Sequence, residues 1–284
     1  KTKRMKHILL PTDFSNNSWN AIQYALQLFK DQKCAFHLLH VYTPIIYQVQ
    51  YFEVPINQSS LIDEIKDSSD KQLDNQLDKM NSEFKNEQHT FYKISSFNTL
   101  ENEVAALYQK NVFDFIVMGT KGASGITEIL FGSNTVHIIK NAKCPVLAIP
   151  NDFSFESPRE ILFPSDYEID FKKELIQPIV DITSIFNARI HILNASYGYD
   201  LSEQQKRNKK KLATHFKNSA YLFHSVSNES VPEAIAKFQV KTRINLLVMI
   251  NNKHSFFENI FFTSKIKQIG FHLNVPFLVI PAKS

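Results

Sequence analysis

Short apolar runs alternate with longer amphipathic stretches along the whole chain. The amphipathic stretches repeat apolar residues at helical spacing, as in Leu73, Leu77, Met80 and Phe84. Strands that alternate with helices in this way predict βαβ units built around a parallel sheet. The runs predicted to be strands are 7–11, 34–42, 90–95, 113–119 and 145–149, then 160–164, 188–195, 220–226, 245–250 and 276–280.

The second half of this pattern repeats the first. The segment Cys144–Pro150 is matched by Val275–Pro281, 131 residues later. The segment His7–Asp13 is matched by Glu160–Asp166, 153 residues later. The difference of 22 residues predicts an insertion in the first copy, between Thr43 and about Asp63, without clear periodicity. A repeat of this length indicates tandem domains and not a solenoid.

We therefore expect an α/β protein of two tandem doubly wound domains, residues 1–151 and 152–284. The boundary is placed in a short polar segment that follows the run 145–149. Each domain is predicted to be a five-stranded parallel sheet. Right-handed crossovers then put helices on both faces of each sheet.

Four of the six glycines fall close together, at Gly119, Gly122, Gly125 and Gly132. They lie between the apolar run 113–118 and a segment that resembles the start of a helix. Glycines allow backbone to come close to a ligand, and the N–H groups of a helix start suit an anion such as phosphate. The spacing matches neither a P-loop nor a dinucleotide fingerprint. The alternative is a glycine-rich turn without a ligand.

The motif Gly119-x2-Gly122-x9-Gly132-Ser133 resembles the nucleotide loop of the universal stress protein family. The opening segment His7–Ser15 and the later Cys144–Pro150 also resemble strands of that family. The resemblance implies that the first domain binds ATP, with Mg²⁺ or Mn²⁺ held through the phosphates. The residues that it implies as the ATP-binding set are Pro11, Thr12, Asp13, Val41, Met118, Gly119, Lys121, Gly122, Gly132, Ser133, Asn134 and Thr135.

The resemblance also assigns a role to several of these residues. Asp13 contacts the nucleoside, and the backbone at Val41 meets adenine. Gly119 and Gly122 approach ribose and phosphates. The helix start from Gly132 to Asn134 holds the phosphates.

The position of Asp13 gives an independent reason to consider it. Ligands of open α/β sheets bind beyond the carboxyl ends of the strands, where strand order reverses. Asp13 and Gly119 follow the first and fourth predicted strands, so both belong at that edge. A carboxylate there can accept hydrogen bonds from an amine or from hydroxyls. Asp13 could instead cap the next helix, a role that Ser15 could also fill.

The second copy departs from the nucleotide motif. Gly119, Gly122 and Gly132 are replaced by Ile250, Lys253 and Thr263, whereas Ser264 is retained. A β-branched residue such as Ile250 avoids positive φ and would fill space that ribose needs. The aromatic segment Phe256–Phe262 stands where the first copy has Gly125, and it suggests packing against a neighbour. Asp166 is retained, and a helix N-cap would explain it. Nucleotide binding is therefore expected in the first copy only.

The sequence favours binding over catalysis. Phosphoryl transfer needs a positioned nucleophile and a metal-holding carboxylate. Lys121 and Glu128 near the loop are as readily explained as surface residues, and His137 as a half-buried helix residue. No side chain is assigned as catalytic or as a metal ligand. The function expected is an ATP-binding protein of stress response or signalling. A slow ATP hydrolase or transferase and a nucleotide-free interaction scaffold are the alternatives.

Charge and composition narrow the class of protein further. The net charge of +4, with both signs interspersed, does not favour nucleic acid as a partner. The basic run Lys206–Lys211 is interpreted as a solvated helix face. Cys34 and Cys144 have neither disulfide-framework nor zinc spacing. No apolar run reaches the roughly 18 residues of a membrane span, and no signal-peptide pattern opens the chain, so the cytoplasm is expected. Met5 is interpreted as a possible native start after an added segment.

The runs 145–149 and 276–280 each have a proline at both ends, which is typical of sheet edges. We expect the two copies to pair through these strands as an intramolecular pseudo-dimer, and a homodimer remains possible. The insertion after Thr43 is expected to cover the nucleotide edge of the first domain or the seam between domains. Loops of that length tend to be lids or binding loops.

Overall fold

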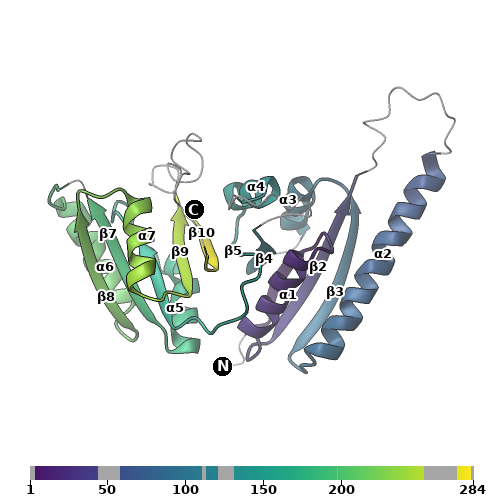
Figure 1. Ribbon diagram of the computed structural model, residues 1–284, viewed down its shortest axis with the longest axis horizontal. Helices are drawn as coiled ribbons and strands as arrows, with labels where there is room; N and C mark the ends of the chain where they lie inside the picture. The colour runs from purple at the N-terminus through teal and green to yellow at the C-terminus, as the bar shows by residue number, and fades with distance from the viewer. Residues whose placement is uncertain are drawn as a thin grey trace. The chain divides into compact units, whose positions relative to one another are not determined.

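A computed structural model describes residues 4–43, 58–110, 113–120, 131–196, 198–252 and 274–282, without the side chains of 58–61. The chain forms two compact units, Lys1–Cys144 and Pro145–Ser284. Figure 1 shows helices and strands alternating in both. None of the helices in the described ranges combines the length and the apolar character that crossing a lipid bilayer requires.

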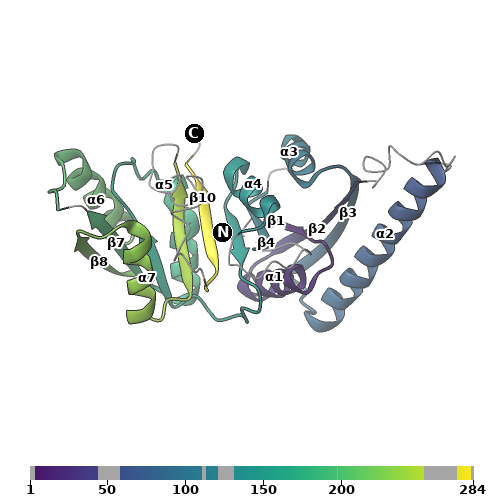
Figure 2. The same ribbon diagram turned by 45° about the horizontal axis from the view of Figure 1, so that its top comes forward.

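The first unit is a parallel sheet with helices on both faces. Its strands are β1 (Lys6–Pro11), β2 (Cys34–Tyr42), β3 (His89–Phe97) and β4 (Phe115–Gly119), in the order β3-β2-β1-β4. Its helices are α1 (Asn16–Leu28), α2 (Gln58–Glu83), α3 (Leu100–Lys110) and α4 (Ser133–Asn141). Figure 2 shows α3 and α4 across the strands from α1. Strand order reverses between β1 and β4, so this is the switch point of the unit.

Apolar spacing accounts for the helices and strands of this unit. Helix α1 buries Ala21, Tyr24, Ala25 and Leu28, which lie at helical spacing on one face. Strand β4 is buried at every position, as expected for a parallel strand covered on both faces. The predicted strands therefore agree closely with the observed ones.

The second unit repeats this architecture. Its strands are β5 (Val146–Ile149), β6 (Glu160–Pro164), β7 (Arg189–Ser196), β8 (Ala220–Ser227), β9 (Leu246–Asn251) and β10 (Phe277–Pro281), in the order β5-β10-β9-β6-β7-β8. Its helices are α5 (Lys173–Phe186), α6 (Glu203–His215) and α7 (Val231–Lys241). Figure 1 shows α7 in front of the strands, with α5 and α6 behind them. Strands β6 to β10 run parallel, with β6 paired to both β7 and β9.

The two short proline-flanked strands pair with each other, as predicted. Strand β5 is antiparallel to β10, with Leu147 opposite Leu278. Through this pairing β5 groups with the second unit, whereas the sequence places 145–149 at the end of the first copy. A strand belongs to the sheet with which it forms hydrogen bonds, which need not be the sheet of its own sequence repeat. Hydrophobic periodicity alone does not show which strand it pairs with.

The insertion contains more regular structure than its composition predicted. Residues 44–57 lie outside the described part, but α2 begins at Gln58 and includes the end of the segment predicted to lack periodicity. Helix α2 has 26 residues, whereas its counterpart α6 has 13. Its second half packs through Leu73 and Met80, both fully buried. The helix was predicted from the apolar residues beginning at Leu73, although Ile62 and Ile65 lie at helical spacing in the first half.

Candidate functional site

The candidate site lies at the switch point, where β1 and β4 end side by side. The two strands pair through Ile8 with Phe115 and through Leu9 with Ile116. Beyond Pro11, the N–H of Thr12 still donates to the Leu39 carbonyl at 2.8 Å. The chain then turns sharply into α1, which places Asp13 at the same edge as Gly119.

This turn is built by Thr12, whose side chain is buried. Its Oγ1 accepts a hydrogen bond from the Phe14 N–H at 3.1 Å. Phe14 itself adopts a φ of 62°, a left-handed conformation that costs energy in a residue other than glycine. The hydrogen bond to Thr12 offsets part of that cost. The result is that Asp13 projects as an exposed side chain.

Ser15 is the N-cap of α1, and Asp13 is not. Ser15 Oγ accepts from the Ser18 N–H at 3.2 Å. Asp13 Oδ1 in turn accepts from the Ser15 N–H at 3.1 Å and from the Ser15 hydroxyl. Partial desolvation raises the pKa of the Asp13 carboxyl, but the hydrogen bonds from Ser15 outweigh it, so the pKa is lowered overall. Asp13 is therefore an ionised, exposed carboxylate at the sheet edge.

Gly119 is required by a close contact and not by its backbone conformation. A Cβ at this position would lie 2.0 Å from Asn17 Oδ1 and 2.7 Å from Asn17 Cγ. Asn17 is buried in the first turn of α1. The φ of Gly119 is not positive, so the argument from φ against Ile250 was wrong. The expectation that a side chain here would occupy the space of ribose stays a prediction, and Asn17 is the neighbour that a Cβ at Gly119 would meet first.

Helix α4 begins at the same edge. Gly132 is its N-cap and offers no side chain to the helix N–H groups, while Ser133 and Asn134 are exposed. The Gly132 N–H donates to the Thr120 carbonyl at 2.7 Å. Buried Thr135 donates its hydroxyl to the Gly119 carbonyl at 3.0 Å, which ties the helix start to the end of β4.

The remaining members of the predicted set are divided between this edge and the part not described. Met118 is buried in β4, and Val41 is half-buried near the carboxyl end of β2. Lys121 and Gly122, with Gly125 and Glu128, lie outside the described residues. The structure therefore brings Pro11, Thr12, Asp13, Val41, Met118, Gly119, Gly132, Ser133, Asn134 and Thr135 to the carboxyl ends of β1, β2 and β4 and the start of α4.

His137 differs from expectation. It was interpreted as a half-buried helix residue, but its side chain is 57% exposed, and its Nδ1 lies 3.5 Å from Glu101 Oε2. The residue thus belongs to a surface contact between α4 and α3. Nothing in this geometry directs it toward the switch point.

The equivalent edge of the second unit keeps the turn. Ser165 Oγ accepts from the Tyr167 N–H at 3.1 Å, and Tyr167 has a φ of 60°. Asp166, however, is more enclosed than Asp13: burial raises the pKa of its carboxyl, and the Glu168 N–H opposes this effect. The backbone carbonyl of Asp166 accepts a hydrogen bond from Gln205 Nε2 at 2.9 Å. The second unit keeps the geometry of the turn, but the polar groups of Asp166 form hydrogen bonds within the unit.

Two expectations for this copy can be checked. Asp166 does not cap a helix, because the N-cap of α5 is Lys172. Ile250 is buried at the end of β9, where the first unit has Gly119. Lys253, Thr263, Ser264 and the aromatic segment 256–262 lie outside the described residues.

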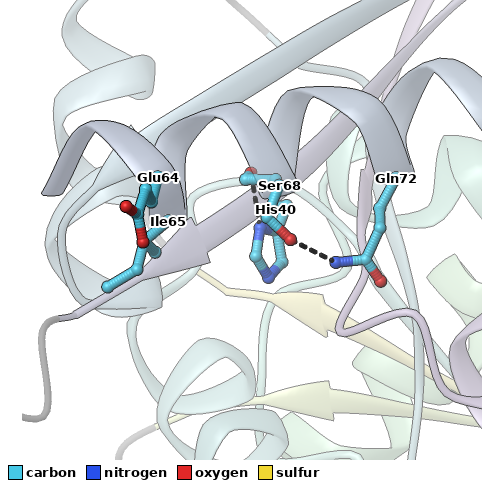
Figure 3. Close-up of a pocket in the computed structure, with 6 residues that line it drawn as sticks. His40, Glu64, Ile65, Ser68 and Gln72 are labelled. Atoms are coloured by element: carbon cyan, nitrogen blue, oxygen red, sulfur yellow. Dashed lines mark hydrogen bonds between the residues drawn. The ribbon is translucent and has the colours of Figure 1, made fainter. Parts of the chain in front are cut away.

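Sequence reasoning missed a polar network beside the switch point. His40 Nδ1 on β2 lies 2.7 Å from Ser69 Oγ on α2, and Ser69 Oγ lies 2.8 Å from Ser95 Oγ on β3. Figure 3 shows His40 facing Glu64, Ile65, Ser68 and Gln72 of the helix. The available signal was the run of polar residues that follows the predicted insertion, which was placed between Thr43 and about Asp63. Among the described residues, no group of three or more His, Cys, Asp or Glu side chains is arranged to hold a metal ion.

A mostly parallel sheet with helices on both faces and a strand-order reversal defines a doubly wound, Rossmann-like α/β domain. The sequence model of the universal stress protein family matches residues 5–150, and the chain belongs to this family.

Two relatives agree with this assignment, and a solved structure shares the fold. The chain is 31% identical over 149 residues to universal stress protein MJ0531 of Methanocaldococcus jannaschii, covering 51% of this chain and 81% of the relative. It is 27% identical over 153 residues to universal stress protein MJ0577 of the same organism, covering 51% and 94%. The crystal structure of a universal stress protein from Archaeoglobus fulgidus aligns with a TM-score of 0.69 at 18% identity, over 97% of this chain and 96% of that one.

Proposed function

We propose that the first unit binds ATP at the switch point and that the protein acts in stress response or signalling through this bound nucleotide. The observation that carries the proposal is the start of α4. Gly132 leaves the first N–H groups of this helix without a side-chain cap, and Ser133 and Asn134 stand exposed beside them. Uncapped N–H groups and the positive end of the helix dipole favour phosphate.

The opposite end of the site suits a nucleoside. The exposed Asp13 carboxylate can accept hydrogen bonds from ribose hydroxyls or from an adenine amine. The backbone of β2 at Val41 is the proposed adenine contact, and Gly119 lets the ligand approach the end of β4 closely. Lys121 and Gly122 are proposed to complete the phosphate end.

Mg²⁺ or Mn²⁺ is proposed to bind through the phosphates. The donor set fits this arrangement, because Asp13 is the one acidic side chain among the proposed contacts and its hydrogen bonds with Ser15 direct it to the nucleoside end. The cation would neutralise phosphate charge. The cytoplasm is the proposed compartment, and pairing of the two copies as a pseudo-dimer is the proposed arrangement.

The proposal is tested by nucleotide content and stoichiometry. We expect about one ATP per chain, released on denaturation of the purified protein and detected by mass spectrometry. Gly122→Val should weaken ATP binding at least about 100-fold, roughly 2.7 kcal/mol, by blocking phosphate approach. Lys253→Val, at the matching position of the second copy, should leave affinity unchanged.

Several results would count against this function. Two nucleotides per chain would mean that the second copy also binds. Unchanged affinity in Gly122→Val would show that the loop is wrongly assigned. Absence of any nucleotide binding would favour the interaction scaffold, and ATP turnover that Gly122→Val abolishes would favour the slow hydrolase or transferase.

A further inference from the structure

The first half of α2 has no counterpart in α6, since α2 has 26 residues and α6 has 13, and it forms one wall of an open hollow. A hollow of about 330 Å³ lies between β2 and this half-helix, lined by His40, Glu64, Ile65, Ser68, Ser69 and Gln72 (Figure 3). The volume is within the range of small-molecule sites. All of these residues except His40 come from α2 upstream of Leu73, where the apolar packing of the helix begins.

The buried position of the half-helix beside the hollow is a serine, Ser69, where packing alone would favour an apolar residue, while Glu64, Ser68 and Gln72 at the rim are exposed. Ser69 is 1% exposed and has hydrogen-bond partners on two strands, His40 and Ser95. Burying hydroxyl groups costs free energy unless they are bonded, and it gains less than burying a leucine would. The network holds the imidazole of His40 in place, and the ring packs against Phe14 with 4.3 Å between ring centres. The cavity therefore has a positioned polar wall.

The second unit uses the corresponding position differently. The Leu39 carbonyl accepts the N–H of the residue that follows β1, and the Leu193 carbonyl accepts the N–H of the residue that follows β6. The two leucines are therefore equivalent, and so are the residues after them, His40 and Asn194. Asn194 Nδ2 donates to the Ser165 carbonyl at 2.9 Å and is buried within its own unit. Asn194 therefore forms a hydrogen bond inside the second unit, whereas His40 at the equivalent position of the first unit lines the hollow.

The chemistry of the lining selects the occupant. It offers one carboxylate, an imidazole, two hydroxyls and an amide, and it contains no lysine or arginine. Burial lowers the pKa of His40, against the attraction of Asp13, so the imidazole is neutral at pH 7. An anion such as phosphate would face Glu64 without a compensating cation. Hydroxyl groups, which both donate and accept, match every polar group of this wall.

We propose that this cavity is a second binding site of the first unit, for an uncharged polyhydroxy molecule of sugar or polyol class. Glu64 accepts from hydroxyl donors, while Gln72 and Ser68 donate to hydroxyl oxygens or accept from them. The site is distinct from the phosphate end at α4 and does not depend on nucleotide binding. It is a property of the longer α2, since α6 has no equivalent half-helix.

The test uses the full chain with histidine side chains labelled with ¹⁵N, and D-ribose as the probe. Ribose at millimolar concentration should shift the His40 side-chain resonances in a saturable way. Inorganic phosphate and the dication putrescine, titrated in parallel, should not. Ser68→Leu should weaken the ribose response at least tenfold by filling the cavity, and Gln72→Leu should do the same by removing the amide. Ser82→Leu, at an exposed position on the same helix, should respond as the parent does.

Each outcome decides the matter. A His40 response to phosphate or putrescine but not to ribose, or no response to any of the three, overturns the proposal. A ribose response that survives both Ser68→Leu and Gln72→Leu places the site elsewhere and also overturns it. ATP affinity, measured on the same samples, should stay within about twofold in both variants. Loss of ATP binding from the parent protein with an intact ribose response would remove the proposed function and leave this site standing.

Discussion

The Asp13 and Asp166 turns have similar backbones, but the two aspartates have different surroundings. In both, a buried hydroxyl accepts the N–H two residues on, at 3.1 Å, and the residue after the aspartate has a φ near 60°. In the first unit the carboxylate is exposed and its pKa is lowered. In the second unit the carboxylate is more enclosed, its pKa is raised, and Gln205 bonds the backbone beside it.

The comparison teaches that the fold does not need the site. The second unit keeps the parallel sheet and the sharp turn after β6, although Ile250 has replaced the glycine at the end of β9. The turn is therefore a structural element of the fold. What distinguishes the first unit, for which we propose ATP binding, is an exposed carboxylate and the absence of a side chain at the strand end.

Exchanging the residues at the strand end should have the largest effect. Gly119→Ile introduces a side chain whose Cβ would lie 2.0 Å from Asn17 Oδ1. We expect a loss of ATP affinity of at least about 100-fold, together with a stability loss of about 1–3 kcal/mol from overpacking. Calorimetric titration with ATP and urea unfolding measure the two effects.

The reverse exchange is the matched control. Ile250→Gly should cost about 2–5 kcal/mol, because Ile250 is buried and a large-to-small change leaves a cavity. It should create no second ATP site, since Asp166 remains enclosed. A second equivalent of bound ATP in Ile250→Gly would mean that the strand-end residue alone separates the two units.

Sequence reasoning predicted what depends on local periodicity and local chemistry. The strands, the buried face of α1 and a Ser15 cap as one of two options all followed from spacing and residue type. The pairing of β5 with β10 also followed, from the prolines that flank both strands. Sequence reasoning could not predict that Asn17 approaches Gly119, because this contact joins distant parts of the chain. Asp166 was interpreted as a possible cap because Asp is a common N-cap, but α5 begins several residues later.

Acid should destabilise the first unit more than the second. Burial lowers the pKa of His37 to about 4, with His7 adding to the effect, and burial also lowers the pKa values of His40 and His89. In the second unit the same direction is resolved for His224. Because these groups take up protons near pH 6.5 when unfolded but not when folded, stability is lost as pH falls from about 6.5 toward 4. Asp166 has the opposite sign, since its raised pKa favours the folded state as pH falls.

Hydrogen exchange of the full chain, followed by mass spectrometry and corrected for intrinsic rates, separates the two units. Peptides from β1 and β2 should lose more protection between pH 6.5 and 4.5 than peptides from β6 and β7. His37→Phe should narrow the difference, because the ring keeps its contacts with Tyr92 and Phe113 and no longer titrates. Equal losses in the two units would contradict the assignment of the buried neutral histidines.

The smallest expected effect concerns Ser15, which both caps α1 and donates a hydrogen bond to the Asp13 carboxylate. Ser15→Ala removes the acceptor for the Ser18 N–H and one donor to Asp13, so it should cost about 1 kcal/mol of stability and raise the pKa of Asp13. Ser230 is the N-cap of α7, and its hydroxyl accepts a hydrogen bond from the Glu233 N–H. Ser230→Ala should therefore lower stability by about the same amount without changing the pKa of Asp13. Titration of the Asp13 carboxyl carbon by NMR measures the difference. An unchanged Asp13 pKa in Ser15→Ala would mean that the serine is only a cap, and that the exposed carboxylate owes its ionisation to the backbone of the turn.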